Sequence, residues 1–296
     1  MVCIVKPESG LISVVIPARD SASTINEQLD ALSRQSYTRD WEVIVADNGS
    51  QDGTRDIVND WIGRLPNLRL VDAADARGAN HARNAGSQAS RGERLLFCDA
   101  DDIADVNWVG TMSDALAHYD MVGGCIERKK LNDEVALAAR PLKTVDGLLD
   151  SFGFLPYTPF ANAGMHREVW QRMGGFDESY RYGSEDVEFF WRGQLAGASM
   201  GYAPTAIMHY RLRSDLAGIA HQAYCYGRSH PKLFKTYRSD GMPRSGLRQA
   251  GWEWGWIVAH IPWLLSKKPR QATWLYRSAM RWGRCVGSVR RGVLYL

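Results

Sequence analysis

Short apolar runs alternate with segments of helical spacing over the first hundred residues. Four runs rich in β-branched or aliphatic side chains predict buried strands, at residues 11–17, 42–46, 68–71 and 94–98. The segments between them predict helices at residues 25–32, 56–62 and 79–90. Strands and helices that alternate at this spacing predict βαβ units and an α/β fold with a mostly parallel central sheet and flanking helices.

The pattern is less regular outside these segments. We expect Ser21 or Ser23 to cap the first helix. After about residue 120 the alternation fades, and loops rich in glycine and proline separate isolated helices expected at residues 167–173 and 186–195. Residues 197–204 are expected to return to the body.

Composition narrows the class of protein. Hydrophobic residues make up 45% and charged residues 23% of the 296 residues, which is typical of a globular chain and argues against extensive disorder. The five cysteines are odd in number and widely spaced, which argues against a disulfide framework or a structural zinc site. The first residues lack a basic segment followed by a long apolar run. We therefore expect no secretory signal and a cytoplasmic location.

Charge is distributed unevenly along the chain. Residues 1–227 contain 22 Lys and Arg against 31 Asp and Glu, whereas residues 228–296 contain 14 Lys and Arg against two acids. The basic segment also holds six of the eleven tryptophans: Trp252, Trp254, Trp256, Trp263, Trp274 and Trp282. Tryptophan beside Lys and Arg is typical of a helix at an anionic lipid surface, which would make the protein peripheral on the inner face of the cell membrane.

Other interpretations of the basic segment stay open. Its apolar stretch at residues 250–265 is shorter than the roughly 20 residues that cross a bilayer. The segment could instead form helices that pack on the body with solvated basic faces, or it could form a homodimer contact. No nucleic-acid-binding motif accompanies the charge, so we expect no nucleic acid partner.

Three acids directly follow the fourth apolar run: Asp99, Asp101 and Asp102. Ligands of a parallel α/β sheet bind beyond the carboxyl ends of its strands, so these acids are expected at the binding edge. Carboxylates one residue apart can converge on one hard cation, which can neutralise a departing pyrophosphate. Asp102 could instead cap the next helix.

Asp47 ends the second apolar run, within an Asp-Asn-Gly sequence. Such a sequence favours an Asx turn, in which the carboxylate only holds the loop. At the carboxyl end of a strand, the same carboxylate could accept a hydrogen bond from the imide N–H of a nucleobase. Both interpretations remain open.

Glu185 and Asp186 begin a predicted helix. Acids in a first turn complement the helix dipole, which would explain either acid alone. Phe189 and Phe190 follow, and desolvation by aromatic rings would raise a carboxylate pKa toward that of a general base. His209 ends another apolar run and is either a structural histidine or a metal ligand.

Six segments match the pattern of one known family, in the family's order. They are residues 14–17 (VVIP), 46–54 (ADNGSQDGT), 78–86 (GANHARNAG), 96–102 (LFCDADD), 174–178 (GGFDE) and 183–186 (GSED). Together they resemble the family 2 glycosyltransferases of the GT-A fold, which invert the anomeric centre and use a nucleotide-sugar donor and a divalent metal. The resemblance covers about residues 11–215. It implies a GT-A catalytic domain over residues 1–215 and leaves residues 216–296 as a basic, Trp-rich helical extension.

The resemblance also implies roles for particular residues. The donor, a UDP-sugar by first expectation, would contact Pro17, Ala18, Asp47, Gly78, Arg83, Asp99, Ala100 and Asp101, with Asp47 on the uracil. Asp101 and His209 would bind Mn²⁺ or Mg²⁺. Asp186 would be the general base, with Glu185, Asn162, Ala163, Gly174 and Gly175 on the side of the acceptor and the transferred sugar. If the tail binds a membrane, the acceptor would be a lipid-linked or cell-envelope saccharide.

Some positions depart from the family pattern. Asn48 stands where a second acid is usual, and residues 19–20 and Arg77 also differ, so dTDP and GDP donors remain open. A nucleotidyltransferase shares the sheet and the paired acids, but residues 17–21 lack its glycine- and lysine-rich phosphate loop. A nucleotide-sugar-binding or membrane-associated scaffold without turnover is the non-enzyme alternative, and binding alone would not need Asp186.

Overall fold

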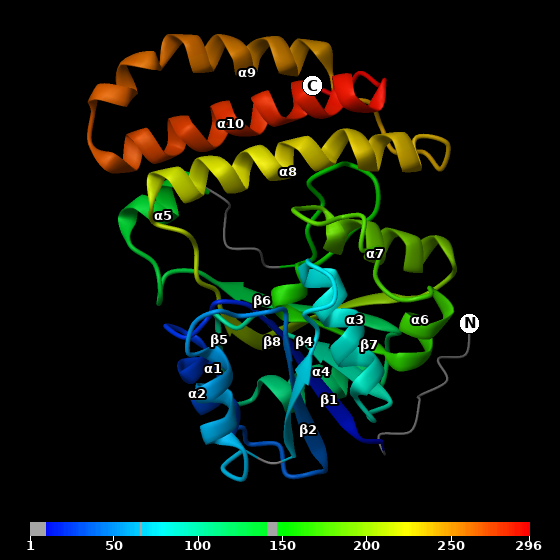
Figure 1. The fold of residues 1–296 in the computed structure, drawn as a ribbon. Helices are drawn as coiled ribbons and strands as arrows, with labels where there is room; N and C mark the ends of the chain where they lie inside the picture. The colour runs from blue at the N-terminus through cyan, green and yellow to red at the C-terminus, as the bar shows by residue number, and fades with distance from the viewer. Residues whose placement is uncertain (1–9, 66, 141–146) are drawn as a thin grey trace.

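The computed structural model describes residues 10–65, 67–140 and 147–296 (Figure 1). Cys3 and the amino-terminal segment, where we expect no secretory signal, lie outside the described residues. The four cysteines within the described ranges are free thiols: Cys98, Cys125, Cys225 and Cys285.

One eight-stranded sheet forms the centre of the body, in the order β3-β2-β1-β4-β7-β6-β8-β5. Its first half contains β1 (Ile12–Ala18), β2 (Trp41–Asp47), β3 (Leu68–Asp72) and β4 (Arg94–Phe97), which pair in parallel. Helices α1 (Ile25–Ser33), α2 (Thr54–Trp61) and α3 (Ala79–Ala89) connect them. The four predicted strands, the three predicted helices and their alternation are confirmed.

The predicted cap of α1 is wrong. Thr24 is the N-cap residue, and its side chain makes no capping hydrogen bond. The carbonyl oxygen of Ser21 instead accepts hydrogen bonds from the backbone N–H groups of Thr24 and Ile25. A backbone turn therefore starts this helix, which a search for capping side chains does not detect.

The second half of the sheet is mixed. It contains β5 (Ile103–Ala104), β6 (Met121–Glu127), β7 (Ala163–His166) and β8 (Met200–His209). β7 runs antiparallel to β4 and β6, β6 pairs in parallel with β8, and β5 runs antiparallel to β8. The expectation of only loops and isolated helices after residue 120 is therefore wrong. The predicted return of residues 197–204 to the body is confirmed, because residues 200–204 form the first part of β8.

Shorter helices surround this half of the sheet. They are α4 (Trp108–Leu116), α5 (Glu134–Ala139), α6 (Arg167–Arg172), α7 (Glu185–Leu195) and the 3-10 helix η1 (Phe160–Asn162). The predicted helices at residues 167–173 and 186–195 are confirmed as α6 and α7. An aromatic cluster fixes α7 to the end of β4, because Phe176 lies 4.7 Å from Phe189 and 5.2 Å from Phe97, ring centre to ring centre.

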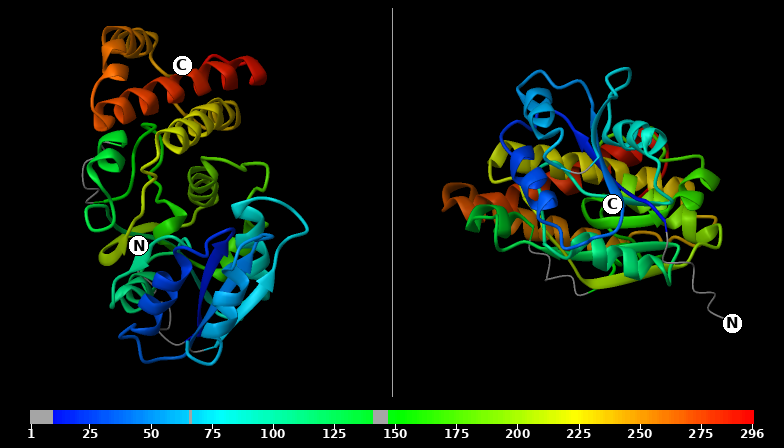
Figure 2. Two further views of the ribbon diagram at one scale, coloured as in Figure 1. Left: turned by 60° about the vertical axis from the view of Figure 1, so that its left-hand side comes forward. Right: turned by 90° about the horizontal axis from the view of Figure 1, so that it is seen from below.

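Three long helices cover one end of the body (Figures 1 and 2). They are α8 (Leu216–Tyr237), α9 (Leu247–Ala259) and α10 (Lys268–Arg291), with the 3-10 helix η2 (Ile261–Leu265) before α10. α8 lies nearest the sheet, α10 packs on α8 and α5, and α9 lies outermost. Among the described helices, none combines the length and apolar character needed to cross a bilayer.

Glycines allow α8 and α10 to approach closely. A Cβ atom on Gly227 of α8 would collide with the backbone of Met280, and one on Gly283 of α10 would collide with the backbone of Tyr224. A Cβ on Gly287 would lie 2.6 Å from the carbonyl oxygen of Arg228. Backbone contact at these positions leaves no room for a larger side chain.

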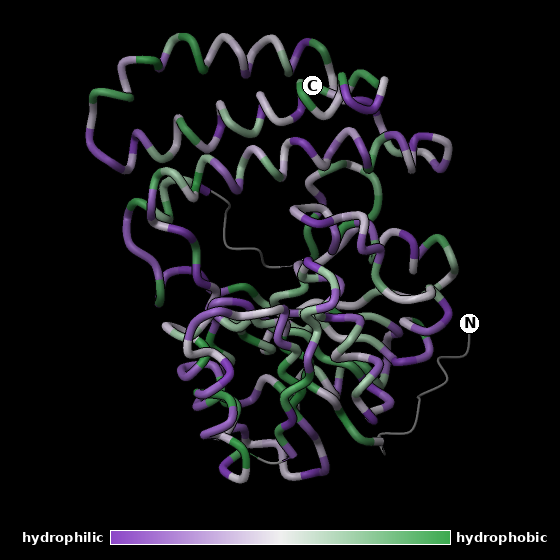
Figure 3. Tube along the Cα trace, in the orientation of Figure 1, coloured by the Kyte–Doolittle hydropathy of each residue, from purple (hydrophilic) through white to green (hydrophobic). Residues whose placement is uncertain are grey.

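The tryptophans of the tail divide into two groups. Trp256 stacks on His260 at 4.1 Å between ring centres, and Trp274 donates a hydrogen bond from Nε1 to the carbonyl oxygen of Ile257. Trp256 also packs edge-on against Trp263 of η2 at 5.4 Å between ring centres, so these contacts join α9 to η2 and α10. Trp252 and Trp282 are instead 63% and 60% exposed. Helix packing therefore accounts for only part of the tryptophan content of the tail, and apolar residues recur along the outermost helix (Figure 3).

Candidate active site

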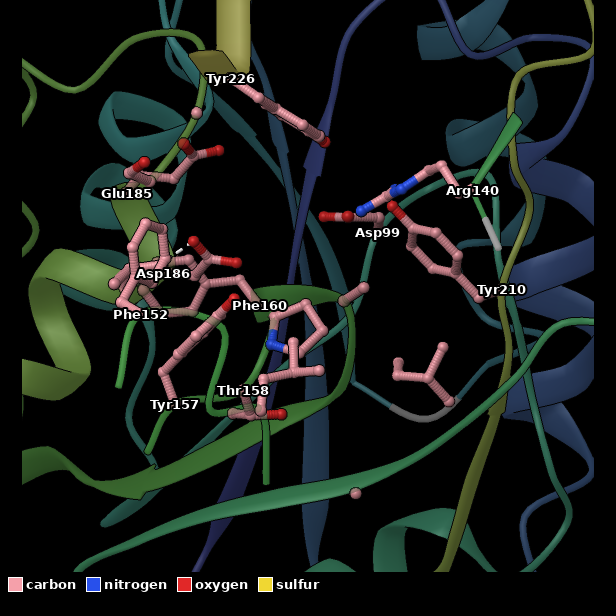
Figure 4. Close-up of a pocket in the computed structure, with 18 of the residues that line it drawn as sticks. Asp99, Arg140, Phe152, Tyr157, Thr158, Phe160, Glu185, Asp186, Tyr210 and Tyr226 are labelled. Carbon is pink, nitrogen blue, oxygen red and sulfur yellow. Dashed lines mark hydrogen bonds between the residues drawn. The ribbon is translucent and has the colours of Figure 1, made fainter. Parts of the chain in front are cut away.

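A cavity of about 180 Å³ lies where the sheet meets α7 and α8. Its lining includes Arg83, Asp99, Arg140, Tyr157, Phe160, Glu185, Asp186, Tyr210, Tyr226 and His230. Figure 4 shows Glu185 and Asp186 on one side of the cavity and Asp99, Arg140 and Tyr210 on the other. Asp99, one of the strand-end acids, and the two acids that begin α7 thus line the same cavity. The volume lies below the roughly 300 Å³ of small ligand pockets, so it suits the reacting groups rather than a whole nucleotide sugar.

Asp99, Asp101 and Asp102 form one acidic cluster, with ligand oxygens within 4.8 Å of one another. Asp102 is fully buried, and its Oδ1 accepts a hydrogen bond from the backbone N–H of Arg211 at 2.8 Å. Its Oδ2 has no hydrogen-bond partner among the described residues. Desolvation by the surrounding atoms and the charge of Asp99 raise the pKa of Asp101 to about 6. Repelling carboxylates with a free buried oxygen fit a hard divalent cation such as Mn²⁺ or Mg²⁺.

Arg83 reaches this cluster from α3. Its Nη2 donates a hydrogen bond to Oδ1 of Asp99 at 2.9 Å, and its guanidinium lies 4.7 Å from the centre of the Phe160 ring. Ala100, between the two acids, is buried and points away from solvent. The predicted donor-side residues Arg83 and Asp99 are therefore in direct contact.

The start of α7 has an unusual backbone. Gly183 has φ 128° and Ser184 has φ 63°, both in the left-handed region. A Cβ on Gly183 would lie 2.7 Å from the ring of Tyr226 on α8. Strained backbone of this kind is common where a site needs particular side-chain directions. Here it directs the next two residues, Glu185 and Asp186, to the cavity.

Burial changes the acidity of both residues. Desolvation and the negative charge of Glu185 together raise the pKa of Asp186 to about 7. Desolvation also raises the pKa of Glu185, whose Oε2 is buried without a hydrogen-bond partner among the described residues. Asp186 can therefore exchange a proton near neutral pH, as a general base must.

Asp47 lies outside this cavity. Its side chain is fully buried, and Oδ2 accepts a hydrogen bond from Nη1 of Arg55 at 3.0 Å. Both carboxylate oxygens also lie within 3.4 Å of the backbone N–H of Ser50. The contacts with Ser50 agree with the first of the two interpretations of Asp47, in which its carboxylate holds the loop.

Asn48 organises the loops next to Asp47. Its backbone N–H donates to the carbonyl oxygen of Ala18, and its Oδ1 accepts from the N–H of Gly78 at 2.9 Å. Its Nδ2 donates to the carbonyl oxygen of Ala76 at 2.7 Å. The predicted donor-side residues Pro17 and Ala18, at the end of β1, are therefore connected through Asn48 to Gly78, the N-cap residue of α3. Sequence reasoning treated Asn48 only as a missing acid and did not anticipate this role.

His209 does not belong to the group of acids whose ligand oxygens lie within 4.8 Å of one another, although it pairs with Ile103, next to Asp102, in the sheet. Its Nδ1 lies 2.9 Å from Oε2 of Glu127, the last residue of β6. Hydrogen bonding to His209 contributes to lowering the pKa of Glu127, against the opposing effect of burial. The histidine therefore has a carboxylate partner of its own.

Four residues expected on the acceptor and sugar side lie elsewhere. Asn162 is fully buried, where its Oδ1 accepts from Nε1 of Trp108 at 2.7 Å and its Nδ2 donates to two backbone carbonyl groups. Ala163 is buried in β7. Gly174 and Gly175 line a separate, more open groove beside α3. The structure does not bring these residues into the cavity with Asp186.

Several cavity residues were missed at the sequence level. Tyr226 and His230 come from α8, beyond the boundary expected at residue 215, and Arg140 follows α5. None of these three residues belongs to a recognised motif or follows a strand that its apolar residues would predict. A tyrosine or an arginine in a helix has no short-range signal that separates a cavity residue from a surface residue.

Comparison with known proteins agrees with this geometry. The model of the family described as glycosyl transferase family 2 matches residues 13–174, more than half of the chain. The chain belongs to glycosyl transferase family 2. A similar curated protein is the glycosyltransferase AglE of Haloferax volcanii, 30% identical over 199 residues, which are 66% of this chain and 65% of that protein. The pre-mycofactocin glycosyltransferase of Mycobacterium tuberculosis is 27% identical over 243 residues, 76% of this chain and 49% of that protein.

This family 2 chain thus spans between about half and 65% of the length of those two relatives. Two solved structures have a similar fold. Residues 1–349 of TarS from S. aureus in complex with UDP match with a TM-score of 0.53 and 18% identity, covering 96% of this chain and 93% of that one. The mannosyltransferase PcManGT from Pyrobaculum calidifontis, in complex with GDP-Man and Mn²⁺, matches with a TM-score of 0.61 and 20% identity, covering 93% and 86%. The fold is GT-A, as the resemblance implied.

Proposed function

We propose that this chain is an inverting glycosyltransferase that moves a sugar from a nucleotide-sugar donor to a hydroxyl acceptor in one displacement. The observation that carries the proposal is that Asp186, with its pKa near 7, lines the same cavity as Asp99 of the acidic cluster. A carboxylate with a pKa near the working pH is suited to remove a hydroxyl proton. Membership of family 2 supports the same reaction class.

Each group of residues then has a distinct task. Asp186 takes the proton of the acceptor hydroxyl as that oxygen attacks the anomeric carbon, an effect typically of about 10²–10⁴ in rate. Glu185 lies beside it and binds acceptor hydroxyl groups. Asp99, Asp101 and Asp102 would hold Mn²⁺ or Mg²⁺, which neutralises negative charge on the diphosphate when bound. A single displacement needs no covalent sugar–enzyme intermediate.

The proposed donor is a UDP-sugar, with GDP and dTDP donors as alternatives. The nucleoside would contact Pro17 and Ala18 at the end of β1, Asp47 at the end of β2 and Gly78 at the start of α3, with Asp47 accepting from the uracil imide. Arg55 already occupies one side of the Asp47 carboxylate, so uracil would share it. TarS in complex with UDP and PcManGT in complex with GDP-Man, both of similar fold, support a nucleotide donor and leave the base open.

A donor screen tests the proposal. UDP-, GDP- and dTDP-sugars are incubated with Mn²⁺ and a panel of saccharide acceptors, and release of the nucleoside diphosphate is measured. We expect release from UDP-sugars, dependent on an acceptor. Donor binding without release with any acceptor would favour the scaffold alternative, and formation of pyrophosphate from a nucleoside triphosphate and a sugar phosphate would favour a nucleotidyltransferase.

We further propose that residues 216–296 contact an anionic membrane surface on the cytoplasmic side. Exposed apolar side chains gather on the outermost part of the tail, at Leu247, Trp252, Val258, Ile261, Leu264 and Leu265, the last of them 94% exposed. Exposed Lys267, Lys268 and Arg270 follow directly. Apolar side chains beside basic ones suit a lipid surface better than water. A lipid-linked or cell-envelope saccharide would then be the acceptor.

Sedimentation with liposomes tests the membrane contact. We expect the protein to pellet with vesicles that contain phosphatidylglycerol and not with pure phosphatidylcholine vesicles. Leu265→Glu and Trp252→Glu should each reduce pelleting, whereas Val106→Glu, at a half-exposed apolar position of the body, should not. Equal pelleting of all variants would contradict the proposal. Loss of self-association in Leu265→Glu, without lipid binding by the wild type, would favour a homodimer contact.

A further inference from the structure

Arg140 is a half-buried residue, and no acid in the described part of the chain pairs with its guanidinium. Its Nε and Nη1 atoms are buried and have no hydrogen-bond partner among the described residues. Within those residues, no carboxylate lies within the 4.0 Å of an ion pair with it. Its guanidinium lies beside the cavity, 5.5 Å from the centre of the Tyr226 ring and on the same side as Tyr210 (Figure 4).

Such a group is costly unless something else binds it. A buried charge is normally paired, and here the face of the Tyr226 ring and a side-chain hydrogen bond with Tyr210 compensate only in part. The nearby acid Asp99 already accepts a hydrogen bond from Arg83. A second guanidinium, that of Arg128, lines the same cavity and donates to the carbonyl oxygen of Arg140 at 3.2 Å. This wall of the cavity is therefore built to receive negative charge from a ligand.

The position of Arg140 indicates which negative charge it receives. In Figure 4, Asp186 and Arg140 lie on opposite sides of the cavity, with Asp99 on the side of Arg140. In a single displacement the acceptor oxygen attacks from one side and the diphosphate leaves on the other. If Asp186 takes the acceptor proton, the leaving diphosphate faces the wall of Arg140.

We propose that Arg140 binds the diphosphate of the nucleotide-sugar donor, at the phosphate that becomes the leaving group. This inference rests on the proposed function. A guanidinium fixed in a desolvated wall makes strong hydrogen bonds to phosphate oxygens and needs little reorganisation as their charge increases. The bond from the anomeric carbon to the diphosphate oxygen breaks with its electron pair on that oxygen, and Arg140 then neutralises part of the new charge.

Titration with product fragments tests this role. Binding of UDP, UMP and uridine is measured by calorimetry with Mn²⁺ present, for the wild type, Arg140→Gln and Arg140→Lys. We expect Arg140→Gln to weaken UDP binding about tenfold or more, as the loss of a charge-assisted hydrogen bond implies, and to leave uridine binding unchanged. Arg140→Lys should retain part of the UDP affinity. Arg172→Gln removes the same charge from an exposed position of α6 and should change nothing.

The outcomes separate this inference from the function it rests on. UDP binding that is unchanged in Arg140→Gln would overturn the inference alone. So would intact UDP binding with a higher KM for the acceptor, because the anion would then belong to the acceptor. An equal loss of uridine and UDP binding would also overturn it, since a general loss of structure explains that result. A wild-type protein that binds none of UDP, GDP and dTDP would overturn the proposed function as well.

Discussion

The guanidinium of Arg83 donates a 2.9 Å hydrogen bond to Asp99 and so joins α3 to the acidic cluster at the end of β4. Only 5% of the Arg83 side chain is exposed, against 30% for Asp99. The pair is thus mostly shielded from water, where ion pairs have larger effects on stability than at the surface. It also places a positive charge beside one acid of the cluster.

Removing this guanidinium should destabilise the protein. We expect Arg83→Met to lower the free energy of unfolding by about 1–3 kcal/mol, because Asp99 loses its charged partner in a partly buried position. Urea denaturation at pH 7.5 measures the effect. Arg172→Met, which changes an exposed arginine of α6, should stay within about 0.5 kcal/mol of the wild type. A similarly small change in Arg83→Met would show that the pair makes no net contribution.

The rate of transfer should rise with pH through about 7. Asp186 acts as a base only when ionised, and its pKa is raised to about 7. Glu185→Gln removes the neighbouring charge that contributes to this shift, so the acidic limb of the pH–rate profile should move to lower pH. Profiles of kcat/KM for the wild type and Glu185→Gln test this. A limb that stays in place, or moves to higher pH, contradicts the assignment.

The close packing of α8 and α10 can be tested by substituting one glycine at their contact and one glycine away from it. Gly283→Ala should lower the free energy of unfolding by about 1–3 kcal/mol, because its Cβ would collide with the backbone of α8. Gly251→Ala, in α9 with no atom within 4 Å of the added Cβ, should raise it by about 0.5–1 kcal/mol. Thermal denaturation of both variants measures the difference. Equal effects would mean that α10 is not held against α8 as described.

The first half of the fold could be predicted from sequence because its strands are mainly apolar runs, and three of the four, β1, β2 and β4, are almost fully buried. The strands after residue 120 could not. β6 contains Gly123 and Gly124, and β7 contains Gly164, so neither shows the expected apolar pattern. These glycines are required by tertiary packing: a Cβ on Gly164 would lie 2.8 Å from Leu96, and one on Gly124 would collide with Asn162. Contacts between distant segments decide these positions, and local sequence does not encode them.

The candidate site, like the fold, could be predicted only in part from the sequence. Asp99, Asp101 and Asp186 could be identified because the end of a strand, the start of a helix and a family motif are each visible in a short stretch of sequence. Asn162 was placed on the acceptor side, yet its amide bonds within the core. Arg140 was not anticipated, because only the folded structure shows that no acid among the described residues pairs with its guanidinium.

Metal binding should stabilise the protein through the acidic cluster. We expect Mn²⁺ to raise the melting temperature of the wild type, since a ligand that binds only the folded state stabilises it. Asp101→Asn should lose most of this increase, whereas Asp114→Asn, at an exposed position of α4, should keep it. His209→Ala tests the histidine that the family resemblance places among the metal ligands. If Mn²⁺ raises the melting temperature of this variant as much as that of the wild type, His209 is not a ligand. Transfer at the full rate in excess EDTA would contradict a metal requirement.

The role of Asp186 is central to the account, and its amide variant tests that role most directly. Asp186→Asn keeps the size of the side chain and removes its capacity to take a proton. Single-turnover transfer and UDP affinity are measured with the wild type and this variant, using the donor found in the screen. The account predicts unchanged UDP affinity with transfer slowed by about 10²–10⁴. Transfer by Asp186→Asn at the wild-type rate would contradict it.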